Sequence, residues 1–159
     1  MEITFIANSG KPMNIADGWT EQVDTKTARV LLTTGETKPI TELSADDIIS
    51  VPLLCDHETK IDVQAGTVTS LTVNEKGELI ATASLNGTPA GQLVQTLTAD
   101  HDIKNSFSVS ISINDYSNLE PVGDSDNPNG VIYHNALITE ISVVWCGADQ
   151  YATLLSVKE

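Results

Sequence analysis

Three short segments of the chain carry residue types that together could hydrolyse a peptide bond. One is Cys55-Asp56-His57, which closes an apolar run, and another is the alternating run 105–113, which contains Ser108. A serine hydroxyl becomes nucleophilic chiefly when an imidazole within hydrogen-bond reach takes its proton. The third segment, 140–144, begins with Glu140 inside an apolar strand, where an ionised carboxylate needs a partner such as an imidazole. These residues predict a catalytic site formed by His57, Ser108 and Glu140.

The three side chains would have different roles in acyl transfer. Ser108 would attack the scissile carbonyl, and His57 would remove the serine proton and later return it to the leaving amine. Glu140 would orient the imidazole and stabilise its charged form, because a nearby carboxylate favours the imidazolium. On the strand that carries Ser108, the serines at alternate positions share one face and the apolar residues share the other.

The residues alone leave alternatives open for each role. If the strand of Glu140 starts near residue 131, His134 lies an even number of positions away on the same face, so His134 is an alternative third member. Cys55 and His57 also share a strand face and could form a Cys/His pair, although a small buried apolar residue is the structural interpretation of Cys55. Ser108 could likewise be an ordinary solvated serine, and His57 a strand-end residue.

No cofactor or metal is expected. Imidazole and carboxylate groups suit zinc, but no pair of candidate ligands has the short spacing of a zincin or a zinc finger. The candidates considered are Asp56, His57, His101 and His134.

Composition indicates a single acidic domain spanning residues 1–159, since domains commonly hold about 100 to 200 residues. Lys and Arg number 8 against 22 Asp and Glu, for a net charge of −14, so the surface should repel nucleic acid. Positively charged protein segments are plausible partners, although an acidic surface also serves solubility.

Two cysteines are too few for a disulfide framework, which favours a reducing compartment. Without a signal-like start or an apolar run of about 18 residues, we expect no membrane association and no secretion.

The alternation of apolar and polar residues predicts a mainly β (α+β) fold. A helix is expected from Thr88, which can cap it, to Leu97, and a short one from Ser44. The turn sequence 74–77 predicts a hairpin, and the segment 123–130 predicts a mobile loop. The two tryptophans, Trp19 and Trp145, are expected to be core or interface anchors. The expected strands cover residues 3–7, 28–33, 50–55, 65–73, 79–85, 107–113 and 131–144.

The same segments resemble a known family, the prohead serine peptidases of tailed phages. The run 52–57 followed by 65–68 is similar to that family's histidine segment, in which an apolar strand ends in the catalytic His and a Gly-x-Val strand follows. Residues 107–111 are similar to its nucleophile strand, and residues 140–144, with Ala148-Asp149 beyond, to its closing Glu-x-Ser-apolar-Val segment. The resemblance rests on the joint order of these motifs from about residue 50 to 155.

The resemblance implies a capsid maturation protease related to the herpesvirus assemblins. Such a protein is expected to be a small closed or partly closed β-barrel flanked by a few helices. It would cut capsid and scaffold protein segments inside the immature capsid, the prohead, in the host cytoplasm. Relatives also imply self-association, with a dimer as one form. The herpesvirus relatives use a third histidine after the serine, whereas the matching motif here favours Glu140.

Some positions depart from the family pattern. Ser110 stands where the family usually has glycine, which adds a side chain beside the nucleophile. Gly147 and Gln150 stand where prolines are frequent, and Cys55 stands where a large residue is common. The departure at Ser110 favours the alternative function, a catalytically inactive β-rich virion or scaffold component with the same fold. Family members generally carry a scaffold-binding tail that self-cleavage removes, so we expect that this chain is a short, trimmed or engineered form.

Overall fold

The computed structural model describes residues 1–99, 108–113, 118–144 and 149–159; for residues 99 and 108–113 the description covers the backbone. Strands predominate along the described chain, with one α-helix and two short 3₁₀ turns. The elements are β1 (Glu2–Asn8), β2 (Met13–Ala16), β3 (Trp19–Val23), β4 (Arg29–Leu31), β5 (Thr37–Pro39), η1 (Ile40–Glu42), β6 (Pro52–Cys55), η2 (Ile61–Val63), β7 (Gln64–Val73), β8 (Leu79–Leu85), α1 (Pro89–Ala99), β9 (Ser108–Ile113), β10 (Leu119–Gly123), β11 (Pro128–Tyr133), β12 (Leu137–Val144) and β13 (Leu154–Lys158).

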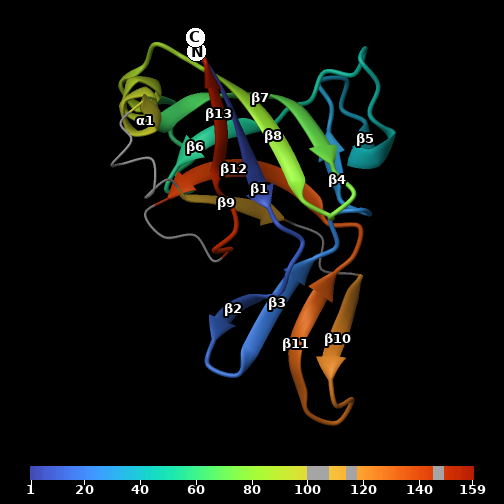
Figure 1. Cartoon of the computed structure of the whole chain (residues 1–159). Helices are drawn as coiled ribbons and strands as arrows, with labels where there is room; N and C mark the ends of the chain where they lie inside the picture. Colours follow the sequence, from blue (N-terminus) through green and yellow to red (C-terminus); the bar gives the residue numbers. More distant parts are fainter. Residues whose placement is uncertain (100–107, 114–117, 145–148) are drawn as a thin grey trace.

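Within the described residues, nine strands form one large sheet and four form a small one (Figure 1). The large sheet has the order β13-β1-β8-β7-β6-β12-β4-β5, and β9 also pairs with β12. It curls into a half-barrel whose end strands, β13 and β5, do not pair with each other. The mainly β prediction is therefore confirmed, and the sheet corresponds to the expected barrel in a partly closed form.

The core lies inside the curl of the large sheet. Strand β8 alternates in the way the sequence predicts, with its odd-numbered residues from Leu79 to Leu85 buried. Strand β12 is buried almost along its whole length, because β9 borders it on one side and β4 and β6 on the other. Any polar group on β12 therefore requires a hydrogen-bond partner inside the protein.

Helix α1 packs against β7 and covers one end of the core (Figure 1). Its predicted cap is confirmed, since the Thr88 hydroxyl accepts a hydrogen bond from the backbone N–H of Gly91 at 3.1 Å. Ala90 and Val94 are buried, whereas Leu93 is 54% exposed. The hairpin predicted around residues 74–77 is also present and joins β7 to β8.

The helix predicted to start at Ser44 is wrong. The Ser44 hydroxyl and backbone N–H both donate to the Asp47 carboxylate, which also binds Lys38. These contacts close a single turn, after which Ile49 bridges to Leu32 and returns the chain to the sheet. Local side-chain bonds of this kind compete with helix formation.

The strand predicted over residues 131–144 is two strands that belong to different sheets. Strand β11 ends at Tyr133 and β12 begins at Leu137, and between them Asn135 has a positive φ of 54°. This left-handed residue turns the chain from the small sheet into the large one. The face shared by His134 and Glu140 therefore does not exist.

The small sheet has the order β10-β11-β3-β2 and projects from one end of the half-barrel (Figure 1). It consists of two antiparallel hairpins that meet through a parallel pairing of β11 with β3. The segment predicted as a mobile loop, 123–130, is the end of one hairpin. Its strands extend to Gly123 and from Pro128, so four residues remain for the turn.

Candidate functional site

His57 lies two residues after the end of β6, in a backbone conformation that non-glycine residues seldom adopt. Asp56 and His57 have φ angles of 54° and 58°, so two consecutive residues are left-handed. The Asp56 N–H donates to the carbonyl of Val143 on β12 at 3.0 Å, which fixes the start of this turn. Residues in such conformations cost about 1–3 kcal/mol each and persist where the surroundings hold them, often at functional sites.

Glu140 lies on β12, the strand next to β6, and is 8% exposed. Its Oε1 contacts Nδ1 of His57, and its Oε2 accepts a hydrogen bond from the Ser142 hydroxyl at 2.9 Å. The His57 side chain is 38% exposed, so the imidazole lies between the buried carboxylate and the surface. This pair is the contact expected between a general base and its orienting acid.

Ser142 connects this carboxylate to the strained turn. Its hydroxyl oxygen accepts a hydrogen bond from the backbone N–H of His57 at 2.9 Å while its proton goes to Glu140. Ser142 is fully buried. One hydroxyl therefore holds both the backbone and the acid partner of His57. Residues two apart on a strand share a face, so the Glu-x-Ser spacing could have revealed this contact from the sequence.

Ser108 is the first residue of β9, which pairs antiparallel with β12 on the side opposite β6. The register places Ser108 opposite Val144 and Ser110 opposite Ser142. The three segments that carry His57, Glu140 and Ser108 are therefore neighbouring strands, with Glu140 on the middle one. The direction of the Ser108 side chain lies outside the described residues, as does any consequence of Ser110 for its surroundings.

Cys55 does not have the properties of an activated nucleophile. Burial, and secondly the charge of Asp56, raise the pKa of its thiol, which disfavours the reactive thiolate. Its side chain packs against the core, in agreement with the structural interpretation.

His134, the alternative third member, lies in a different cluster. Its Nδ1 contacts Asp24 at 2.8 Å and its Nε2 contacts Glu120 at 2.6 Å. The hydrogen bond to Glu120, followed by that to Asp24, raises the pKa of His134. For Asp24, burial acts to raise the pKa, but hydrogen bonds from His134 and Thr27 outweigh it, so the pKa is lowered. His134 thus links the end of β11 to Glu120 on β10 and to Asp24, the residue after β3.

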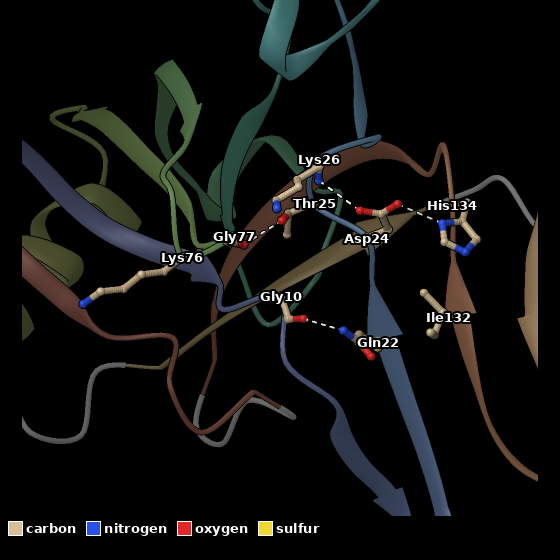
Figure 2. Close-up of a pocket in the computed structure, with 9 residues that line it drawn as sticks. All are labelled: Gly10, Gln22, Asp24, Thr25, Lys26, Lys76, Gly77, Ile132 and His134. Carbon is tan, nitrogen blue, oxygen red and sulfur yellow. Dashed lines mark hydrogen bonds and ion pairs between the residues drawn. The ribbon is translucent and has the colours of Figure 1, made fainter. Parts of the chain in front are cut away.

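A shallow hollow of about 320 Å³ lies beside His134, where the two sheets meet (Figure 2). Its polar groups are largely paired with one another: Gln22 donates to the Gly10 carbonyl at 2.7 Å, and Thr25 to the Gly77 carbonyl at 2.6 Å. Figure 2 also shows the Asp24 carboxylate directed at the His134 ring. No sequence motif indicated this hollow, and none of its lining residues belongs to the His57 cluster.

No group of three His, Cys, Asp or Glu side chains suited to a metal ion occurs in the part of the chain that the structure describes. His57 and His134 each contact carboxylates in separate places, and His101 lies outside the described residues.

Asp149, which lies beyond the segment 140–144, is a buried structural carboxylate. It accepts hydrogen bonds from the hydroxyl of Ser9 at 3.0 Å, from the Ser9 N–H, and from the N–H of Tyr151 at 3.0 Å. It thereby attaches the end of β1 to the segment before β13.

Comparison with known proteins does not extend this description. No family model matches the sequence, and no curated protein matches it. Among the described helices, none combines the length and apolar character that a membrane crossing requires. The contacts of His57 with Glu140 and Ser142, where the end of β6 lies beside β12, therefore stand on the structure alone.

Proposed function

We propose that this chain is a serine endopeptidase that uses Ser108 as nucleophile, His57 as general base and Glu140 as the residue that orients the imidazole. The observation that carries the proposal is the contact between Nδ1 of His57 and the buried carboxylate of Glu140. A carboxylate at Nδ1 holds the proton there, so the lone pair lies on Nε2, the nitrogen that must take the serine proton.

The strand order supports the choice of Ser108, because β9, which begins with Ser108, and β6, which precedes His57, lie on either side of the strand that carries Glu140.

In the proposed mechanism the Ser108 hydroxyl attacks the scissile carbonyl as Nε2 of His57 takes the proton. The imidazolium, stabilised by Glu140, then returns the proton to the leaving amine. Water then attacks the acyl-enzyme carbonyl as Nε2 of His57 takes its proton, and that proton passes to the Ser108 oxygen when the carboxylic acid product leaves. The cost of holding residues 56 and 57 in left-handed conformations fits a site in which the imidazole must be held in one orientation.

The proposed substrates come from the resemblance to prohead peptidases. We infer cleavage of capsid and scaffold protein segments within the immature capsid in the host cytoplasm, by an assemblin-like half-barrel that self-associates, with a dimer as the expected form. Ser110, at a position where the family usually has glycine, favours a second candidate: an inactive β-rich virion or scaffold component of the same fold.

A fluorophosphonate probe, which reacts with activated serines, separates these two candidates. We expect covalent labelling of the wild-type chain at Ser108, shown by peptide mass mapping, and loss of labelling in His57→Ala. Ser70→Ala is the matched control, because it removes an exposed serine on β7, outside the three segments that carry the proposed site. Absence of labelling in a folded wild-type protein, or labelling that survives His57→Ala, would refute the peptidase proposal.

The substrate class needs a separate test. The chain is co-expressed with its capsid and scaffold proteins and compared with Ser108→Ala. Processing that stops in the variant, at unchanged folding, supports the proposed substrates, whereas equal processing by both proteins contradicts them.

A further inference from the structure

The four-stranded sheet β10-β11-β3-β2 projects away from the half-barrel (Figure 1), and one of its two faces carries mostly apolar residues; helix α1 packs against the large sheet instead. The register identifies the residues on this face, because directly paired residues point to the same side of a sheet. Glu21 pairs with Met13 and with Val131, and Leu119 pairs with Tyr133. The part of this face that is not buried includes Met13, Trp19, Glu21, Leu119, Pro121, Val131 and Tyr133, and we call it the hairpin face; Val23, which pairs with Tyr133, is on the same side and is buried.

The hairpin face leaves several apolar and aromatic side chains in contact with solvent. Leu119 is 47% exposed and Pro121 is exposed, while the side chains of Trp19, Val131 and Tyr133 are half-buried. Contiguous apolar surfaces with aromatic residues mark interaction sites in soluble proteins. The other side of the same sheet is different: Gln22 and Ile132 point into the hollow of Figure 2, and Glu120 binds His134.

One carboxylate lies in the middle of the hairpin face. Glu21 is half-buried, and its Oε1 accepts a hydrogen bond from the Tyr133 hydroxyl at 2.7 Å. The four strands contain Glu21 and Glu120 and no Lys or Arg. A cationic group placed on this face would therefore meet a carboxylate and the aromatic rings of Trp19 and Tyr133, which together attract Lys and Arg.

We propose that the hairpin face binds a protein segment that presents one lysine or arginine between apolar residues. The basic side chain pairs with Glu21, and the apolar residues cover the surrounding side chains. Electrostatics favours this occupant over a second copy of the chain, because in a two-fold contact each copy presents the same four strands, which contain no Lys or Arg to pair with Glu21. It also argues against an anionic lipid surface, since the net charge is −14.

The binding site is independent of the chemistry proposed for His57, so the two ideas can fail separately. The test uses the full chain with Ser108→Ala, which excludes cleavage of the probe. A display library of short random peptides is selected on this protein, and the enriched peptides are then measured individually by fluorescence polarisation. Amide chemical shifts locate where they bind.

We expect the enriched peptides to carry a central Lys or Arg with apolar neighbours, and to shift the amides of β3 and β11. Glu21→Gln should lower the affinity for these peptides by about tenfold, because it removes the charge and retains a group that can accept a hydrogen bond from Tyr133. Glu75→Gln is the matched control, since Glu75 is exposed on the β7–β8 hairpin, and should leave the affinity unchanged.

Three results would overturn the proposal. The first is enrichment of peptides that lack a basic residue or that bind equally to Glu21→Gln. The second is a selection that enriches no peptide beyond those enriched in a parallel selection on a protein that also carries Trp19→Asp. That substitution places a charge on the hairpin face. The third is a concentration-dependent dimer, seen by sedimentation velocity, that Trp19→Asp dissociates, because a second copy would then occupy this surface.

Discussion

Replacing Ser142 by alanine is the most informative perturbation of the candidate site. The Ser142 hydroxyl is fully buried and makes two hydrogen bonds of 2.9 Å, one from the backbone N–H of His57 and one to Oε2 of Glu140. Ser142→Ala removes both bonds and leaves each partner in place. The new side chain is smaller, so steric clash cannot account for any loss of stability.

The magnitude follows from the two groups that lose a partner. A buried donor or acceptor left without a hydrogen bond costs about 1–3 kcal/mol, and a charged one lies at the upper end of that range. The N–H of His57 belongs to an exposed residue and should lie at the lower end, because water can replace its partner. We therefore expect Ser142→Ala to lower the free energy of unfolding by about 2–4 kcal/mol.

Urea denaturation of both proteins measures this difference. Ser70→Ala is the matched control, since Ser70 is exposed on β7 and should change the free energy of unfolding by less than about 0.5 kcal/mol. A double-mutant cycle with Glu140→Gln should show coupling of about 0.5–3 kcal/mol, because the two side chains share a hydrogen bond. A Ser142→Ala effect no larger than that of Ser70→Ala would refute the role assigned to this hydroxyl.

Two further predictions concern buried and paired charges elsewhere in the chain. The pKa of His134 is raised above 6.5, first by Glu120 and then by Asp24, so its contribution to stability is complete below pH 6.5 and is lost as the pH rises through the raised value. His134→Gln should flatten that decline in a series of thermal melts across pH, and an unchanged decline would contradict the ion pairs. Asp149→Asn should lower the free energy of unfolding by about 2–4 kcal/mol in urea, because an amide cannot accept all the hydrogen bonds that the carboxylate receives. The exposed Asp46→Asn is its control, and equal effects of the two substitutions would exclude a structural role for Asp149.

Much of the large sheet was predictable because its strands have simple local signals. The alternation of apolar and polar residues predicted β8, and the turn sequence 74–77 predicted the hairpin that precedes it. Capping chemistry located α1, since Thr88 and Pro89 stand where a helix start requires them. These features depend on residues that are near one another in the sequence.

Features that depend on distant contacts were not predictable. Residues 131–144 have a continuous strand pattern, but the left-handed Asn135 divides them between two sheets. Ser44 has the chemistry of a helix cap, but its hydroxyl is used by Asp47, which Lys38 also binds. At residues 131–144 the pairing of each half with a different sheet decides the outcome, whereas at Ser44 a local side-chain bond competes with the helix.

The candidate site was predictable in part. An acid inside an apolar strand requires a partner, and that reasoning correctly anticipated the contact between Glu140 and His57. The left-handed turn at Asp56 and His57 could not be anticipated, since neither residue is a glycine and the conformation is held by β12. The catalytic role of Ser108 stays a prediction, because its side chain lies outside the described residues.

The small sheet cannot form completely until late in synthesis, because its strands come from distant parts of the sequence. Its two hairpins pair through β3 and β11, and the Tyr133–Glu21 hydrogen bond joins residues 112 positions apart. On the ribosome, the hairpin of β2 and β3 emerges early and must wait for most of the chain before β3 acquires its second neighbour. A nascent or truncated chain that ends before residue 133 would therefore lack half of this sheet and would leave a strand edge open to wrong partners.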